Sequence, residues 1–149
     1  ALVTFDPVRS QLLAGGAHLL FDSSEAASSI VDLLIVTPEV LKSAEQRAAL
    51  TALIRGYFSM LAQLRGGNAN LLAQAAANLE LTPEQLQQAM QLIEQPDRVR
   101  NCALLCGTAP PFEATVRQVS DIMAAADLLP AGQRFDGLIA DDFVAEPAQ

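Results

Sequence analysis

The chain has 149 residues, of which 51% are hydrophobic and 5% aromatic, with a formal net charge of −8. At this length a chain buries roughly two-thirds of its unfolded surface, so we expect one domain with a sizeable core rather than a disordered chain. The acidic balance and the single Lys argue against a nucleic-acid partner and a polybasic membrane patch, and the apolar runs are too short to span a bilayer.

Residues 1–36 contain three short apolar runs, each followed by turn-forming residues. The runs are Leu2–Phe5, His18–Phe21 and Ile30–Val36. Continuous apolar runs of this length between turn residues are typical of buried strands, so we predict two or three short strands here. Between the first two runs, Val8–Ala14 is predicted to form a helical turn or two that ends at a pair of glycines.

From Thr37 onward the pattern changes to helix. Thr37 followed by Pro38 predicts a capped helix start, and Ser43 with Gln46 resembles a capping box that opens a long helix through Arg65. This long helix carries apolar residues at spacings of three and four, which predicts one stripe facing the core. The stripe consists of Leu50, Leu53, Ile54, Tyr57, Phe58, Leu61 and Leu64.

Further helix starts follow along the chain. We predict caps at Asn68 or Asn70, at Thr82 before Pro83, and at Asp97. A long amphipathic helix is predicted after Pro110-Pro111. The segment from Phe135 to Val144 is predicted to form short turns with apolar anchors, and the last four residues are expected to fray.

The two cysteines, Cys102 and Cys106, lie four residues apart and so share one face of a helix. We expect two small core thiols, with a disulfide as the alternative in an oxidising compartment. A metal site is not expected, because the chain has one His and no second cysteine pair.

The first residues, Ala1 to Phe5, form an apolar run without an initial Met, a basic region or a signal peptide. We expect the chain to be a segment of a longer protein. Such a segment would expose apolar strand edges, and we therefore expect a homodimer.

An ordered series of motifs carries a resemblance to a known family. The strongest piece is Leu20-Phe21-Asp22-Ser23-Ser24-Glu25 followed by Val31-Asp32. It is accompanied by the Thr4-Phe5-Asp6-Pro7 turn, Pro38-Glu39-Val40-Leu41, Tyr57-Phe58, Leu81 to Gln85, Arg100-Asn101, Phe135 to Ile139 and Asp142-Phe143-Val144. In this order they resemble the C-terminal half of the solute-binding proteins of nitrate/taurine-type ABC importers.

The resemblance implies an α/β fold, the C-terminal portion of a type II periplasmic-binding-protein architecture, helix-rich with two or three short strands. Residues 1–21 would end the second lobe, 22–29 would be the crossover between lobes, and 30–149 would supply a first-lobe strand and a helical layer. The implied function is binding of a small solute in the interlobe cleft, in the periplasm or on a lipid anchor, for delivery to an ABC permease. Lobe closure needs no covalent chemistry and no cofactor.

Phe5 and Asp6 end the first predicted strand, where ligands bind in open α/β sheets. Phe5 is a candidate to wall or stack on a ligand, and Asp6 to accept a hydrogen bond from an amine. The alternative is a core Phe and an ordinary turn residue before Pro7.

Ser23, Ser24 and Glu25, after Asp22, form the candidate hinge. Hydroxyls and backbone N–H groups after a strand suit a sulfonate or nitrate, whereas the carboxylates suit an amine-bearing ligand. The resemblance also implies pyrimidines as a further class of ligand. The alternative is a turn in which Ser24 caps a short helix.

Asp32 interrupts the third apolar run and is the last candidate ligand-binding residue. A buried acid needs a partner, so Asp32 is expected either to accept backbone hydrogen bonds near the cleft or to face water at an edge. The single His18 lacks the partners of a catalytic triad, and no catalytic residue is predicted.

Two other functions compete with the receptor. One is an enzyme of the same superfamily, similar to the pyrimidine-precursor synthases of thiamin biosynthesis, although Cys102 and Cys106 do not resemble the cysteine-rich iron-binding motif of those enzymes. The other is a stand-alone helical interaction module.

Overall fold

The computed structural model describes residues 1–26, 30–130, 132 and 137–145. The chain divides into two compact units. The first unit comprises Ala1–Ile30 and Gln63–Gln95, and the second comprises Val31–Ala62 and Pro96–Gln149. Outside the described residues lie part of the predicted crossover, the residues Phe135 and Asp136, and the predicted frayed tail.

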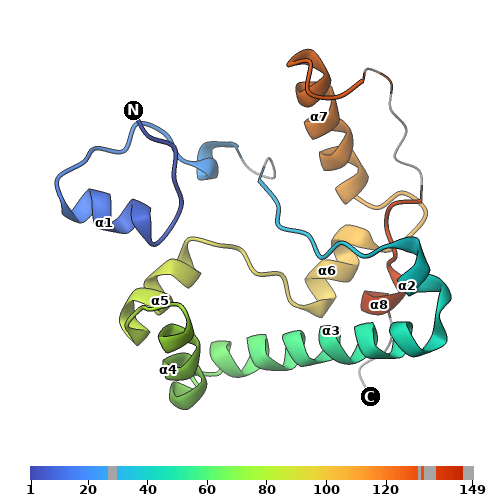
Figure 1. Cartoon of the computed structure of the whole chain (residues 1–149), viewed down its shortest axis with the longest axis horizontal. Coiled ribbons are helices and arrows are strands. Elements are labelled where there is room, and N and C mark those ends of the chain that lie inside the picture. The colour runs from blue at the N-terminus through green and yellow to red at the C-terminus, as the bar shows by residue number, and fades with distance from the viewer. Residues whose placement is uncertain (27–29, 131, 133–136, 146–149) are drawn as a thin grey trace. The chain divides into compact units, whose positions relative to one another are not determined.

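The predicted α/β fold class is wrong for the part of the chain that the structure describes, which contains helices and no strand (Figure 1). The three apolar runs are non-helical, as expected, but a strand exists only where a neighbouring strand completes its hydrogen-bond ladder. Their side chains are mostly exposed, among them Val3, Leu20 and Ile35. The sequence pattern therefore identified segments whose residues favour strands, but it could not show that these segments have no strand to pair with among the described residues.

The first unit contains α1 (Val8–Ala14), a 3₁₀ turn (Ser23–Ala26), α4 (Ala69–Asn78) and α5 (Pro83–Gln91). Helices α4 and α5 pack against each other (Figure 1). The turn between them includes Glu80 with a positive φ of 57°.

Local side-chain caps begin both of these packed helices. The predicted capping box at Thr82 is confirmed: its hydroxyl accepts from the Gln85 N–H at 3.2 Å, and the Thr82 N–H donates to Gln85 Oε1 at 2.8 Å. Asn68 Oδ1 likewise accepts from the Leu71 N–H at 3.1 Å, which selects Asn68 over Asn70 as the cap. These donors would otherwise lack partners at the first helical turn.

The second unit contains α2 (Pro38–Lys42), most of α3 (Ala44–Arg65), α6 (Arg98–Leu105), α7 (Phe112–Ala125) and α8 (Asp142–Ala145). The predicted cap of α6 is confirmed, since Asp97 Oδ1 accepts from the Arg100 N–H at 2.8 Å. Helix α8 is held to α3 by an ion pair between Arg47 and Asp142, and the Arg47 guanidinium lies 4.8 Å from the centre of the Phe143 ring.

The core of the described residues is small. Its buried apolar side chains are Leu50, Leu61, Ala76, Leu86 and Val144. The predicted core stripe of α3 is therefore only partly right, because Leu53 and Tyr57 are at least half exposed. Helix α3 has the apolar spacing of a packed helix, yet little of the described chain covers it. No helix among the described residues is long and apolar enough to cross a membrane.

Candidate functional site

Arg9 on α1 joins the two turns in which the sequence placed candidate ligand residues. Its Nη1 lies 3.9 Å from Oδ2 of Asp6, and its Nη2 lies 3.4 Å from Oδ2 of Asp22. The three side chains are only 15–31% exposed, so water screens them less than it screens surface ion pairs. We call Asp6, Arg9, Ser10, Asp22 and Ser24 the Arg9 cluster.

The Asp6 side of the cluster is built by the start of α1. The N–H of Arg9 donates to the carbonyl of Phe5 at 3.1 Å, which turns the chain into the helix directly after Asp6. One turn along, the Ser10 hydroxyl donates to Oδ1 of Asp6. Asp6 is thereby held against the helix, with its second oxygen toward Arg9.

The Asp22 side is a tight turn closed by its own carboxylate. Oδ1 of Asp22 accepts the Ser24 N–H at 3.0 Å and also the Ser24 hydroxyl. The Glu25 N–H donates to the Asp22 carbonyl at 3.1 Å and begins the 3₁₀ turn. Such side-chain bonds to a nearby backbone N–H are a usual way for Asp to form a turn.

The Ser24 hydroxyl lowers the pKa of Asp22 below its ordinary value. This hydroxyl is the largest cause of the lower pKa, and the Ser24 N–H is the next. Partial desolvation of Asp22 raises the pKa, whereas the charge of Arg9 lowers it further. Hydrogen bonds to the charged form of a carboxyl favour that form. Asp22 is therefore a stable negative charge at neutral pH.

The cluster contains some of the predicted site residues and not others. Asp6 and Ser24 belong to it, whereas the exposed Phe5, Ser23 and Glu25 lie next to it in the chain. Asp32 lies in the second unit and is exposed, which agrees with the water-facing alternative and not with a buried acid. The binding roles assigned to these residues stay predictions.

Sequence reasoning missed Arg9, although a signal for it was present. Arg9 is the only Lys or Arg before Lys42, in a stretch with several acidic residues. A single cation among acids is a reasonable candidate to hold two of them together.

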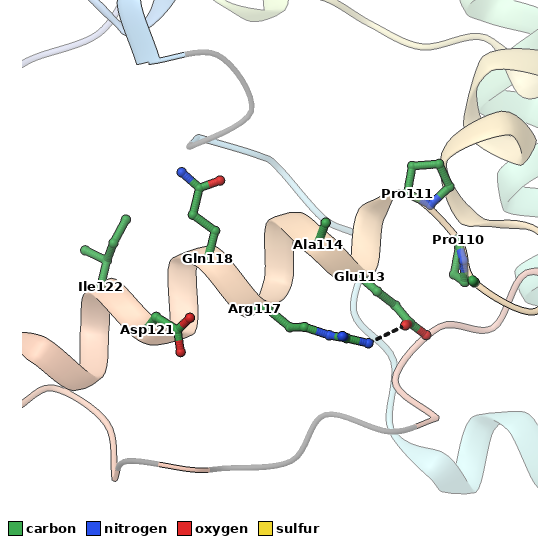
Figure 2. A pocket seen from close by; sticks show the side chains of 9 residues that line it. Pro110, Pro111, Glu113, Ala114, Arg117, Gln118, Asp121 and Ile122 are labelled. Atoms are coloured by element: carbon green, nitrogen blue, oxygen red, sulfur yellow. Dashed lines mark hydrogen bonds and ion pairs between the residues drawn. The ribbon is translucent and has the colours of Figure 1, made fainter.

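Helix α7 carries a shallow hollow of about 700 Å³ (Figure 2). Its lining comes from α7 and from Ala109, Pro110 and Pro111 just before it. The most prominent polar contact is the ion pair between Glu113 and Arg117, at 3.0 Å and one turn apart. Ligand pockets usually enclose the ligand between several elements, so this open helix face is a weaker candidate than the Arg9 cluster.

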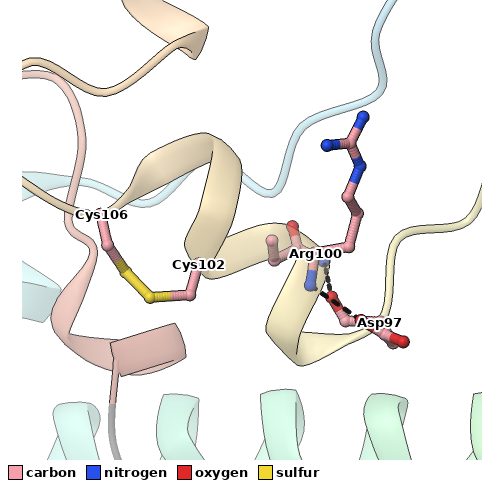
Figure 3. Close-up of a disulfide and its surroundings, with 5 residues drawn as sticks. Asp97, Arg100, Cys102 and Cys106 are labelled. Atoms are coloured by element: carbon pink, nitrogen blue, oxygen red, sulfur yellow. Dashed lines mark hydrogen bonds between the residues drawn. A yellow bond between two sulfur atoms is a disulfide. The ribbon is translucent and has the colours of Figure 1, made fainter.

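Cys102 and Cys106 form a disulfide at the end of α6 (Figure 3). The expectation of two core thiols was wrong: both residues are half-buried and oxidised, and the Cys106 N–H also donates to the Cys102 carbonyl at 2.8 Å. The last helical turn brings the two Cα atoms within 4.9 Å, which is inside the range that a disulfide spans. Among the described residues no group of three or more His, Cys, Asp and Glu is arranged to hold a metal ion.

Comparisons with known proteins identify no relative: no family model, curated protein or solved structure matches this chain.

Proposed function

We propose that the chain binds a small solute with an amine group, as part of the receptor component of an ABC importer. The Arg9 cluster carries this proposal. The resemblance assigns the Asp6 turn and the Asp22 turn to the ligand site, and Arg9 contacts both turns, although it lies thirteen residues before Asp22 in the sequence.

The charge of the cluster favours an amine over an oxyanion. Asp6 and Asp22 supply two carboxylates against the one guanidinium of Arg9, so negative charge is in excess, and the neighbouring Glu25 adds to it. The sequence suggested that the Ser24 hydroxyl and N–H could donate to a sulfonate or nitrate. In the structure both groups already donate to Asp22. The exposed Phe5 side chain, next to Asp6, offers a ring face that attracts cations.

The disulfide supports the location that the receptor function requires. Disulfides persist in the periplasm and at the cell surface and are rare in the cytosol. The pair Cys102–Cys106 therefore favours the proposed periplasmic or lipid-anchored site of action.

Isothermal titration calorimetry of the whole chain tests the proposal, with small primary amines, taurine, nitrate and a pyrimidine as separate titrants. We expect saturable heats with an amine-bearing solute and at least tenfold weaker binding in Asp22→Asn. Asp121→Asn on α7 is the matched control, because it removes an exposed carboxylate outside the cluster. Binding of nitrate alone, or equal binding by both variants, would overturn the assignment.

A helical interaction module is the second candidate, favoured by the helical content of the described residues. It predicts a chain that binds none of these solutes while its helices stay folded. The same titrations, with far-ultraviolet circular dichroism of each sample, separate the two functions.

A further inference from the structure

The segment 30–36 has strand-forming residues but no partner within the described chain. Its residues are Ile30, Val31, Asp32, Leu33, Leu34, Ile35 and Val36, and the first six are exposed. The large apolar side chains among those six are between 44% and 81% exposed. Figure 1 shows this stretch as an open trace that leads into α2.

The backbone N–H and C=O groups of this segment are also open to pairing. No backbone hydrogen bond joins residues 31–36 to another described residue. A row of unpaired N–H and C=O groups beside β-branched and leucine side chains is a template for pairing with another chain.

We propose that segment 30–36 pairs with the same segment of a second copy, antiparallel and centred on Leu33. In this register all seven residues face a residue of the second copy: Ile30 faces Val36, Val31 faces Ile35, Asp32 faces Leu34, and Leu33 faces the Leu33 of the second copy. The pairing is two-fold symmetric, as a closed dimer of identical chains requires.

Asp32 selects this arrangement over the parallel one. An in-register parallel pair would place the two Asp32 carboxylates directly opposite each other, and like charges at that position destabilise a sheet. The antiparallel register centred on Leu33 moves them onto the diagonal, about 7–8 Å apart. Asp32 then opposes an apolar residue and remains free to face water.

The same register separates the two faces of the ribbon. Side chains alternate along a strand, so Val31, Leu33 and Ile35 of both copies form one entirely apolar face. Asp32 of each copy lies on the other face with Ile30, Leu34 and Val36. Because an isolated two-stranded ribbon is only marginally stable in water, we expect a dimer that dissociates on dilution.

Cysteine cross-linking of the whole chain tests this register, in a Cys102→Ser, Cys106→Ser background that removes the native disulfide, because that disulfide could exchange with an introduced thiol. Leu33→Cys places two thiols opposite each other and is expected to give a covalent dimer under mild oxidation. Ile35→Cys is the matched control, since its partner is Val31, and it should cross-link at least fivefold less. Mixing Val31→Cys with Ile35→Cys should restore cross-linking.

Each outcome decides the proposal. Cross-linking in Ile35→Cys equal to that in Leu33→Cys would indicate parallel pairing or unspecific aggregation and would overturn it. Sedimentation of the unmodified chain as a monomer at every concentration tested would overturn it as well. Leu33→Pro should abolish the dimer, with circular dichroism verifying that the helices are retained, whereas Leu20→Pro should leave the dimer intact.

Discussion

The Nη2 atom of Arg9 lies 3.4 Å from Oδ2 of Asp22, although the two residues are thirteen positions apart in the sequence. The same guanidinium lies 3.9 Å from Asp6, so one side chain joins the start of α1 to the turn before the 3₁₀ helix. No strand among the described residues shares that task. The Arg9 side chain is therefore the principal polar link within residues 1–26.

Arg9→Gln should release this link. Glutamine keeps much of the side-chain length but removes the charge that holds two carboxylates near each other. We expect faster amide hydrogen exchange at Ser24 and Glu25, measured by mass spectrometry, with no change in α4 and α5. Arg117→Gln removes an exposed ion pair on α7 and serves as the control; equal exchange in both variants would contradict the role of Arg9.

The acid dependence of the same turn depends on Ser24. The lowered pKa of Asp22 means that its stabilising contribution is fully present above the ordinary value of 3.8 and is lost as the pH falls through the lowered pKa. Because the Ser24 hydroxyl is the largest cause, Ser24→Ala should raise the pKa of Asp22 toward its ordinary value. Carboxyl-carbon NMR titration measures this.

Ser23→Ala is the matched control for that titration, because Ser23 occupies the same turn and lies outside the Arg9 cluster. It should leave the pKa of Asp22 unchanged. If Ser24→Ala titrates like the unmodified chain, the hydrogen bonds in the turn are not the cause of the lowered pKa.

Helix boundaries were the part of this fold that the sequence predicted well. Thr82, Asn68 and Asp97 each cap a helix through an oxygen that reaches a backbone N–H three residues away. Such signals are local, so a single sequence contains them in full.

Features that depend on distant residues were predicted less well. A strand needs a partner that its own sequence does not name, so the runs Leu2–Phe5 and Ile30–Val36 were assigned to a sheet that the described chain does not form. The Arg9 link was missed for the same reason. Spacing placed Cys102 and Cys106 on one helix face but did not decide between thiols and a disulfide, because both fit that spacing.

Ala76 marks the tightest packing in the first unit, since it is fully buried on α4, the helix that packs against α5. Ala76→Leu adds three carbon atoms where there is no free space, and overpacking of this kind costs about 1–3 kcal/mol. Urea unfolding should show a correspondingly lower midpoint. Ala77→Leu, at the next and exposed position, is the control and should change the free energy of unfolding by less than about 0.5 kcal/mol.

Arg47 attaches α8 to α3 in the second unit through two interactions at once. Its guanidinium pairs with Asp142 and lies 4.8 Å from the centre of the Phe143 ring. Both partners are on a four-residue helix that is too short to be stable alone. Arg47→Met keeps apolar contact with the ring but loses both electrostatic interactions. Since the side chains of the ion pair are 39% and 51% exposed, we expect a cost of only about 1 kcal/mol.

The effect of Arg47→Met should be concentrated in α8, where hydrogen exchange of Val144 and Ala145 should approach that of an unstructured peptide. Arg47→Lys separates the two interactions, because it keeps the charge near Asp142 but lacks the planar group that stacks on Phe143. It should protect these amides to an intermediate degree. Full protection in Arg47→Met would show that the buried Val144 and the contact of α8 with α6 hold the helix without Arg47.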